Sequence, residues 1–276
     1  MTGISLESAS ITDIGKKRKS NQDAWYCNDH IGLYIVADGM GGHSGGDIAS
    51  RIIVDTMSAI FENPESSMIE PIDPMPGDQL STRAGALVES IYRANHDVYE
   101  HAGRNKPLKG MGSTVSAVLF TGDTLIVANV GDSPVYLIRD DQIDTLSVSH
   151  SMVSDPDRDA SFAGRVKHML TRAVGPDNTV EVDSCEIQCF DQDIIVLCTD
   201  GLSNMVSVSE VKKAVQSLSP KDACRFLVDL ANENGGFDNT TIIVVKVIKL
   251  RHNKASVIQG VFGWFRQFMK MINSKG

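Results

Sequence analysis

The stretch that decides the fold is GLYIVADGMGGHSGGD, residues 32–47, where an apolar run ends in an acid and a glycine-rich segment follows. The run is rich in β-branched and aromatic residues and predicts a buried strand. Five glycines beyond Asp38 leave the backbone free to bend, and a helical pattern begins after them. A metal or phosphate site would explain an acid at this place. For a lone glycine-rich loop a plain strand-to-helix turn is the better explanation, so the remaining sequence has to decide.

Composition excludes several classes of protein. The chain has 276 residues, of which 42% are hydrophobic, which is sufficient for a substantial globular core. Its 35 acidic and 26 basic residues give a net charge of −9, which argues against nucleic-acid binding as the main function. The five cysteines form no CxxC pair, and no signal peptide or apolar run long enough to span a membrane is present. We expect a cytoplasmic monomer.

Elsewhere, short β-type runs and helical patterns occur in separate blocks. The β-type runs are closely spaced in the middle of the chain, which predicts antiparallel hairpins. They cover residues 24–27, 32–38, 113–120, 124–130, 134–139, 179–187, 193–200 and 240–248. Helical periodicity covers residues 45–62, 81–102, 208–218 and 221–232, with Ser44 and Ser81 as expected N-caps. The pattern predicts an α+β fold in which helices flank stacked antiparallel sheets.

Five aspartates lie at the ends of these predicted strands: Asp23, Asp38, Asp132, Asp200 and Asp238. Each one taken alone is typical of a turn. If the strand ends converge, two carboxylates about 4 Å apart repel by roughly 4 kcal/mol at an effective dielectric near 20. Divalent cations relieve such repulsion, and oxygen ligands without cysteine or histidine favour Mg²⁺ or Mn²⁺. Gly39 has no side chain to keep a cation from its own carbonyl oxygen.

A basic segment, GKKRKSNQD, residues 15–23, immediately precedes the first predicted strand of this group. A solvated basic turn is one interpretation. The other is that the planar guanidinium of an arginine reaches a phosphoryl group beside the cations.

These motifs together resemble the metal-dependent Ser/Thr protein phosphatases, the PPM or 2C-type family, in their bacterial stand-alone form. The resemblance covers about Ile4 to Ile248. Its motifs, in order, are Gly15-x-x-Arg18-x-x-Asn21-Gln22-Asp23, Ala37-Asp38-Gly39-Met40-Gly41-Gly42-His43, Gly112-Ser113-Thr114, Asn129-Val130-Gly131-Asp132-Ser133, Leu170-Thr171-Arg172-Ala173-Val174-Gly175, Thr199-Asp200-Gly201-Leu202 and Asp238-Asn239-Thr240-Thr241. Each motif is short and weak alone, but chance does not readily produce seven in the right order.

The resemblance implies a four-layer αββα sandwich with a binuclear metal centre at one end of the sheets. It further implies a Mg²⁺- or Mn²⁺-dependent phosphatase in which water activated by two ions hydrolyses phosphoserine and phosphothreonine on proteins, counteracting a Ser/Thr kinase. By the same resemblance, Asp38 bridges both ions and Gly39 offers its carbonyl to one, while Asp200 and Asp238 complete the other. Asp23 holds metal-bound waters, Asp132 with Asp200 binds a third ion, and Arg18 grips the substrate phosphate.

The chain departs from the family pattern at several positions. Met40 stands where eukaryotic relatives carry a histidine that is proposed as general acid. Asn204 stands where many relatives carry an aspartate, which bears on the third ion. Pro134 replaces an arginine of the usual Gly-Asp-Ser-Arg motif, and the flap region, residues 151–167, is shorter and more acidic than usual.

Residues 249–276 differ from the rest of the chain. They contain six lysines and arginines and no acid, with a broad apolar face if the segment is helical. A helix packed on the domain is one interpretation, and docking to a protein or a membrane surface is the other. We therefore divide the chain into a catalytic domain, residues 1–248, and a basic amphipathic tail, residues 249–276.

Two other functions have to be weighed against catalysis. The chain could be a phosphoprotein-binding module that has the fold without turnover, although the intact acids and Arg18 argue against this. It could also be a scaffold whose function resides in the tail.

Overall fold

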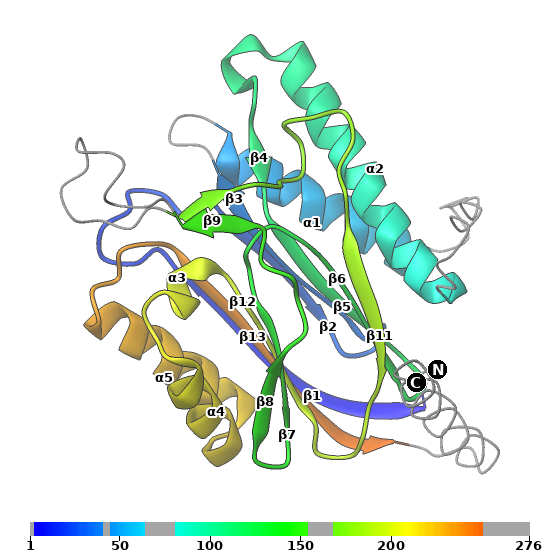
Figure 1. Ribbon diagram of the computed structural model, residues 1–276, viewed down its shortest axis with the longest axis vertical. Coiled ribbons are helices and arrows are strands. Elements are labelled where there is room, and N and C mark those ends of the chain that lie inside the picture. Colours follow the sequence, from blue (N-terminus) through cyan, green and yellow to red (C-terminus); the bar gives the residue numbers. More distant parts are fainter. Residues whose placement is uncertain (1–2, 41–44, 64–80, 154–167, 251–276) are drawn as a thin grey trace, which may run out of the picture.

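The computed structural model describes residues 3–40, 45–63, 81–153 and 168–250. Two large antiparallel sheets form the centre of this described part (Figure 1). The first sheet has the strand order β1 (Ile4–Asp13), β13 (Thr240–Leu250), β12 (Ile194–Cys198), β7 (Val135–Arg139) and β8 (Gln142–Thr145). The second has the order β11 (Asp183–Gln188), β6 (Thr124–Val130), β5 (Val115–Thr121), β3 (Leu33–Met40) and β2 (Asp23–Asn28), and β4 (Gly112–Ser113) pairs with β3.

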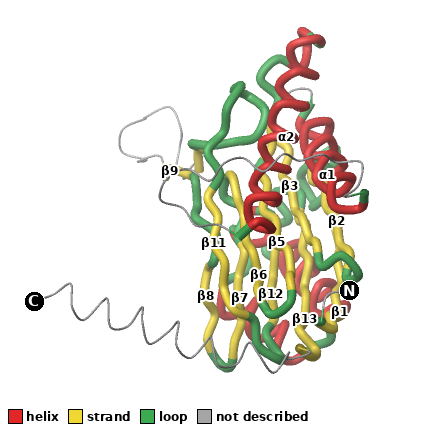
Figure 2. The backbone as a smooth tube through the Cα atoms, turned by 90° about the vertical axis from the view of Figure 1, so that its right-hand side faces the viewer, coloured by secondary structure: helices red, strands yellow, loops and turns green. Residues whose placement is uncertain are grey.

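Helices cover the outer face of each sheet (Figure 2). Helices α1 (Gly46–Glu62) and α2 (Thr82–Arg104) pack on the second sheet, and a short 3₁₀ turn, η1 (Lys106–Leu108), follows α2. Helices α3 (Asp200–Ser203) and α5 (Pro220–Glu233) pack on the first sheet, and α4 (Val208–Ser217) packs on α5. The predicted αββα sandwich is therefore confirmed, and so are the four predicted helices, to within a few residues at their ends.

The alternation of side chains along the central strands produces three apolar layers. In β3, Leu33, Ile35 and Ala37 join the layer under α1 and α2, whereas Tyr34 and Val36 join the layer between the sheets. The strands of the other sheet alternate in the same way between that inner layer and the layer under α3, α4 and α5. Because both faces of each central strand are buried, these strands have continuous apolar runs in the sequence.

The helix starts were predicted with mixed success. Ser81 caps α2 as expected, because its side chain accepts a hydrogen bond from the Ala84 amide. Ser44, the other expected cap, lies outside the described residues, and the residue that precedes the first turn of α1 is Gly45, which has no side chain to cap it.

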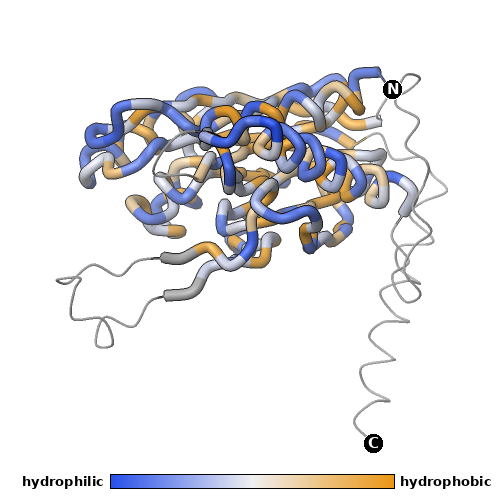
Figure 3. Tube along the Cα trace, turned by 90° about the horizontal axis from the view of Figure 1, so that it is seen from above, coloured by the Kyte–Doolittle hydropathy of each residue, from blue (hydrophilic) through white to orange (hydrophobic). Residues whose placement is uncertain are grey.

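Four of the observed strands were not predicted, namely β1, β8, β9 and β10. β1 pairs with β13 from Ile4↔Leu250 to Asp13↔Thr240, so β13 continues two residues beyond Ile248. β9 (Ser151–Val153) and β10 (His168–Leu170) pair with each other and project from the sandwich (Figure 3). No helix in the described ranges has both the length and the apolar character needed to cross a membrane.

Candidate active site

The two sheets bring four of the five aspartates together at one end. Asp23 begins β2 and is paired with Asp38 near the end of β3. Asp200 begins α3 directly after β12, and Asp238 lies just before β13. Since β12 and β13 are neighbours and both contact β3 across the sandwich, these ends meet. The convergence expected from the sequence is therefore present.

The carboxylates interact strongly with each other. The pKa of Asp38 is raised well above its usual range, mainly because the surrounding protein removes water, and further by the charges of Asp23, Asp200 and Asp238. Burial also raises the pKa of Asp200, as does the charge of Asp238, although a hydrogen bond from Asp38 opposes the rise. Ionising all of these groups at once is thus unfavourable unless positive charge is supplied.

Two threonine hydroxyls hold the carboxylate of Asp23 in place by hydrogen bonds. Its Oδ2 accepts hydrogen bonds from Thr241 Oγ1 at 2.6 Å and Thr199 Oγ1 at 2.9 Å. Burial raises the pKa of Asp23 to about 7, although the two threonine hydroxyls oppose this. Its Oδ1 is buried without a hydrogen-bond partner among the described residues. Sequence reasoning assigned no role to Thr199 and Thr241. Both lie in quoted motifs, Thr199 directly before Asp200 and Thr241 three residues after Asp238.

Gly39 is packed so tightly that only glycine fits. A Cβ atom here would lie 2.1 Å from the Gly46 carbonyl oxygen and 2.6 Å from that of Gln22. The Gly39 amide donates to Gln22 O at 3.1 Å. The glycine therefore allows the start of α1 and the chain before Asp23 to approach the end of β3.

Arg18 lies beside the carboxylates and binds one of them. Its Nη2 donates to Asp238 Oδ2 at 2.5 Å, and its side chain is 46% exposed. That hydrogen bond is the main reason that the pKa of Arg18 is raised, and the charges of Asp38 and Asp200 contribute. The interpretation of Arg18 as a cation at the site is thus supported, whereas its contact with phosphate is a proposal.

The segment that carries Asp132 lies next to Asp38, because Thr114 contacts both Asp38 and Ser133. The Thr114 amide donates to Asp38 O at 2.9 Å, and Thr114 Oγ1 accepts from the Asp38 amide at 3.0 Å. The same hydroxyl is 2.8 Å from Ser133 Oγ, which belongs to the residue after Asp132. The backbone that carries Asp132 is therefore tied to the backbone of Asp38.

The oxygen atoms gathered here are suitable ligands for divalent cations, although they do not form a complete coordination sphere. Two buried oxygens, Asp23 Oδ1 and Asp200 Oδ1, have no partner among the described residues, and both belong to acids whose ionisation burial opposes. Across the described ranges, no three His, Cys, Asp or Glu side chains already stand at metal-ligand spacing. Existing contacts explain why no such group is formed. Arg18 is ion-paired with Asp238, and Asp38 is hydrogen-bonded to Asp200. A cation held by Asp38, Asp200 and Asp238 would replace both interactions.

Comparisons with known proteins identify the family. The family model described as Protein phosphatase 2C matches residues 15–234. The chain belongs to the protein phosphatase 2C family. It is accordingly a Mg²⁺- or Mn²⁺-dependent protein serine/threonine phosphatase.

Relatives of this phosphatase are found among bacterial proteins. It is 32% identical over 247 residues to serine/threonine phosphatase stp of Listeria innocua, which covers 85% of this chain and 93% of the relative. Among solved structures, PppA of Pseudomonas aeruginosa has a TM-score of 0.71 at 31% identity, covering 89% of this chain and 99% of the other. The catalytic domain of the phosphatase PstP, solved with two manganese ions, has a TM-score of 0.71 at 28% identity, covering 88% and 99%.

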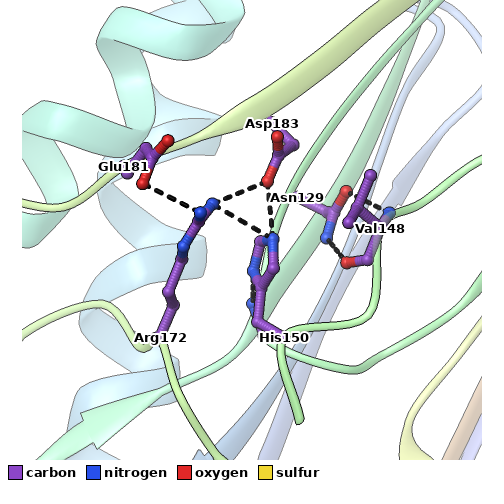
Figure 4. A network of polar contacts seen from close by, with 7 residues as sticks. Asn129, Val148, His150, Arg172, Glu181 and Asp183 are labelled. Atoms are coloured by element: carbon purple, nitrogen blue, oxygen red, sulfur yellow. Dashed lines mark hydrogen bonds and ion pairs between the residues drawn. The ribbon is translucent and has the colours of Figure 1, made fainter.

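A second polar cluster in the phosphatase lies beside the loop that carries Asp132 (Figure 4). His150 Nδ1 accepts from the Gly131 amide at 3.0 Å, so the ring proton is on Nε2, which donates to Asp183 Oδ2 at 2.5 Å. Arg172 donates to Asp183 at 2.8 Å and to Glu181 at 2.9 Å. This cluster connects the loop at Gly131 with the segments that carry His150, Arg172 and Asp183. Sequence reasoning quoted the motif containing Arg172 without assigning that residue a role.

A cavity of about 480 Å³ lies at the opposite end of β12 from Asp200, between Arg139, Phe190 and Lys246. Arg139 is already engaged there, since it donates to both oxygens of Asp193 at 2.9 and 2.8 Å and stacks on the Phe190 ring at 4.5 Å. The cavity therefore offers no free guanidinium to a ligand and lies apart from the carboxylates.

Proposed function

We propose that Asp38, Asp200, Asp238 and the Gly39 carbonyl hold two divalent cations, and that Asp132 with Asp200 holds a third. The observation that carries this proposal is the convergence of mutually repelling acids, two of whose buried oxygens have no hydrogen-bond partner in the part of the chain that the structure describes. Bound ions would supply a Lewis acid for the phosphoryl group and lower the pKa of a water.

The chain's own residues then have defined tasks. Arg18, exposed and already beside Asp238, presents further N–H donors that fit two phosphoryl oxygens of a phosphoserine or phosphothreonine side chain. Asp23 Oδ2 is fixed by Thr199 and Thr241, so Oδ1 is the oxygen that accepts a hydrogen bond from water or carries a proton. None of these tasks requires a cysteine nucleophile.

The proposal also includes the opposing enzyme, the cellular location, the oligomeric state and the role of the C-terminal tail. The phosphatase opposes a Ser/Thr kinase in the cytoplasm and acts as a monomer. Residues 249–276, of which 251–276 lie outside the described residues, would serve as a docking element for a protein or a membrane surface.

Hydrolysis of p-nitrophenyl phosphate and of a phosphothreonine peptide, with and without Mn²⁺, tests the proposal. Asp38→Asn and Asp238→Asn should abolish both reactions and weaken Mn²⁺ binding measured by calorimetry. Asp55→Asn, which removes the same charge from an exposed position of α1, should change neither. Mn²⁺ and phosphopeptide binding without any hydrolysis by the unmodified protein would instead identify a phosphoprotein-binding module.

A further inference from the structure

The basic segment between β1 and β2 contains three lysines that the proposed chemistry does not use. Lys16, Lys17 and Lys19 flank Arg18, and all three are exposed. The loop that leads into β13 carries Asp238, and in Figure 1 the basic segment lies beside this loop. The lysines are thus next to the candidate phosphate-binding arginine.

The backbone of this segment is fixed in place. The amides of Lys16 and Lys17 donate to the Gly236 carbonyl at 2.8 and 3.2 Å. Asn239 Nδ2 donates to Ile14 O at 2.9 Å and to Ser20 O at 3.1 Å, so it holds both ends. A solvated turn would not need such anchoring, whereas a surface that recognises a partner benefits from being rigid before binding.

The three lysine side chains have no acidic partner in the part of the chain that the structure describes. Within the described ranges, no hydrogen bond or ion pair joins any of these three side chains to a carboxylate. The nearby acids are occupied, since Asp13 Oδ1 accepts from Gly15 N and Asn232 Nδ2, and Asp238 pairs with Arg18. On a chain with a net charge of −9, this is a local patch of opposite sign that attracts anionic groups.

Two exposed apolar side chains border the patch. Phe237 is 51% exposed and directly precedes Asp238, and Ile14 is 40% exposed. The stem of Lys16 runs against Gly236, because a Cβ on that glycine would lie 3.1 Å from Lys16 Cγ. Apolar contacts beside the cations suit a peptide better than a small inorganic anion.

We infer that Lys16, Lys17 and Lys19 dock acidic residues that flank the phosphoserine or phosphothreonine of the protein substrate. Neighbouring residues of an extended peptide are about 3.3–3.6 Å apart, so acids within the first few positions can reach these lysines while the phosphate is at Arg18. The inference rests on the proposed function and adds a preference for acidic phosphorylation sites.

The experiment compares phosphothreonine peptides with three glutamates, three serines or three lysines placed on either side of the phosphoresidue. Exposed ion pairs are individually weak, so the unmodified protein should prefer the best acidic peptide over the neutral one by about tenfold in kcat/KM, mostly through KM. This preference should fall as NaCl rises from about 50 to 500 mM.

The triple variant Lys16→Gln, Lys17→Gln, Lys19→Gln should lose the preference. Its p-nitrophenyl phosphate kinetics and its inhibition by inorganic phosphate should match those of the unmodified protein. A matched variant, Lys213→Gln, Lys221→Gln, Arg83→Gln, removes the same charge from exposed positions of α4, α5 and α2, and it should retain the preference.

Each other outcome has a definite meaning. No preference in the unmodified protein, or equal preference in the two triple variants, overturns the inference. Weaker inhibition by inorganic phosphate in the first triple variant also overturns it, because the lysines would then act on the phosphoryl group itself. Co-sedimentation with phosphatidylserine vesicles that is lost only in this variant would show that the patch binds membranes instead. Failure of the unmodified protein to hydrolyse p-nitrophenyl phosphate with Mn²⁺ would refute the proposed function and not this inference alone.

Discussion

Replacing Gly39 by alanine should damage both stability and activity far more than the added methyl group suggests. The new Cβ would lie 2.1 Å from Gly46 O and 2.6 Å from Gln22 O, whereas an ordinary contact is 3.4 Å or more. Both obstacles are backbone atoms, so a rotamer change cannot relieve the clash, and the start of α1 or the chain before Asp23 must shift by about 1 Å.

The magnitude follows from these contacts. Overpacking of this kind costs about 1–3 kcal/mol, and we expect the upper half of that range because only backbone can yield. A displacement of about 1 Å between Asp23 and Asp38 should lower kcat/KM for p-nitrophenyl phosphate by roughly 100-fold. Urea denaturation and steady-state kinetics in Mn²⁺ measure the two effects on the same preparation.

Gly85→Ala is the matched control. Gly85 lies in α2, and a Cβ there would meet no atom within 4 Å. The same substitution should therefore stabilise the protein by about 0.5–1 kcal/mol through helix propensity, without changing kcat/KM. If Gly39→Ala unfolds at the same urea concentration as the unmodified protein and retains full activity, the tight approach at β3 does not position the site.

Further predictions concern single side chains. Arg139→Ala should destabilise the protein by about 3 kcal/mol in urea denaturation with unchanged kcat/KM, because it leaves the carboxylate of Asp193, 1% exposed, without its cation; a loss below about 1 kcal/mol would contradict this. In EDTA, stability should fall as pH rises from about 4 to 7, since the unfolded chain releases the Asp23 proton near pH 4 and the folded chain, with a pKa of about 7, does not. Asp23→Asn should make the fall of stability with pH less steep, by up to about 1.4 kcal/mol per pH unit, in thermal melts across this range. The same slope in the variant and the unmodified protein would show that Asp23 titrates normally. Arg18→Ala should raise KM for a phosphothreonine peptide more than it lowers kcat, and near-normal kinetics would remove Arg18 from phosphate binding.

The sequence predicted most of the architecture because each central strand is buried on both faces. A run such as Leu33–Ala37 must be apolar throughout, so it is readable without the structure. Strand β1 escaped prediction because it lies at a sheet edge and alternates only weakly between exposed and half-buried positions. The N-cap of α1 could not be read either, since Gly45 provides no side-chain signal.

The candidate site was readable from the sequence only in part. Acids at strand ends and an arginine in a basic segment are visible as residues, and their order in the chain revealed the family. The support of Asp23 by Thr199 and Thr241 was not visible, because 176 and 218 residues separate these partners along the chain. Threonines within β-type runs are ordinary, so composition offered no signal for them.

The sequence by itself determined the long helices, the central strands and the residues that carry charge, since these depend on local side-chain chemistry. The tertiary structure alone decided which charges share a site and which are neutralised. Pairing of β2 with β3, and packing of β12 and β13 against β3, place Asp38 within the field of three other acids. Two carboxylate oxygens of this group have no partner among the residues that the structure describes. The physical reason is that Coulomb repulsion and desolvation depend on distance and burial, which the order of residues along the chain does not specify.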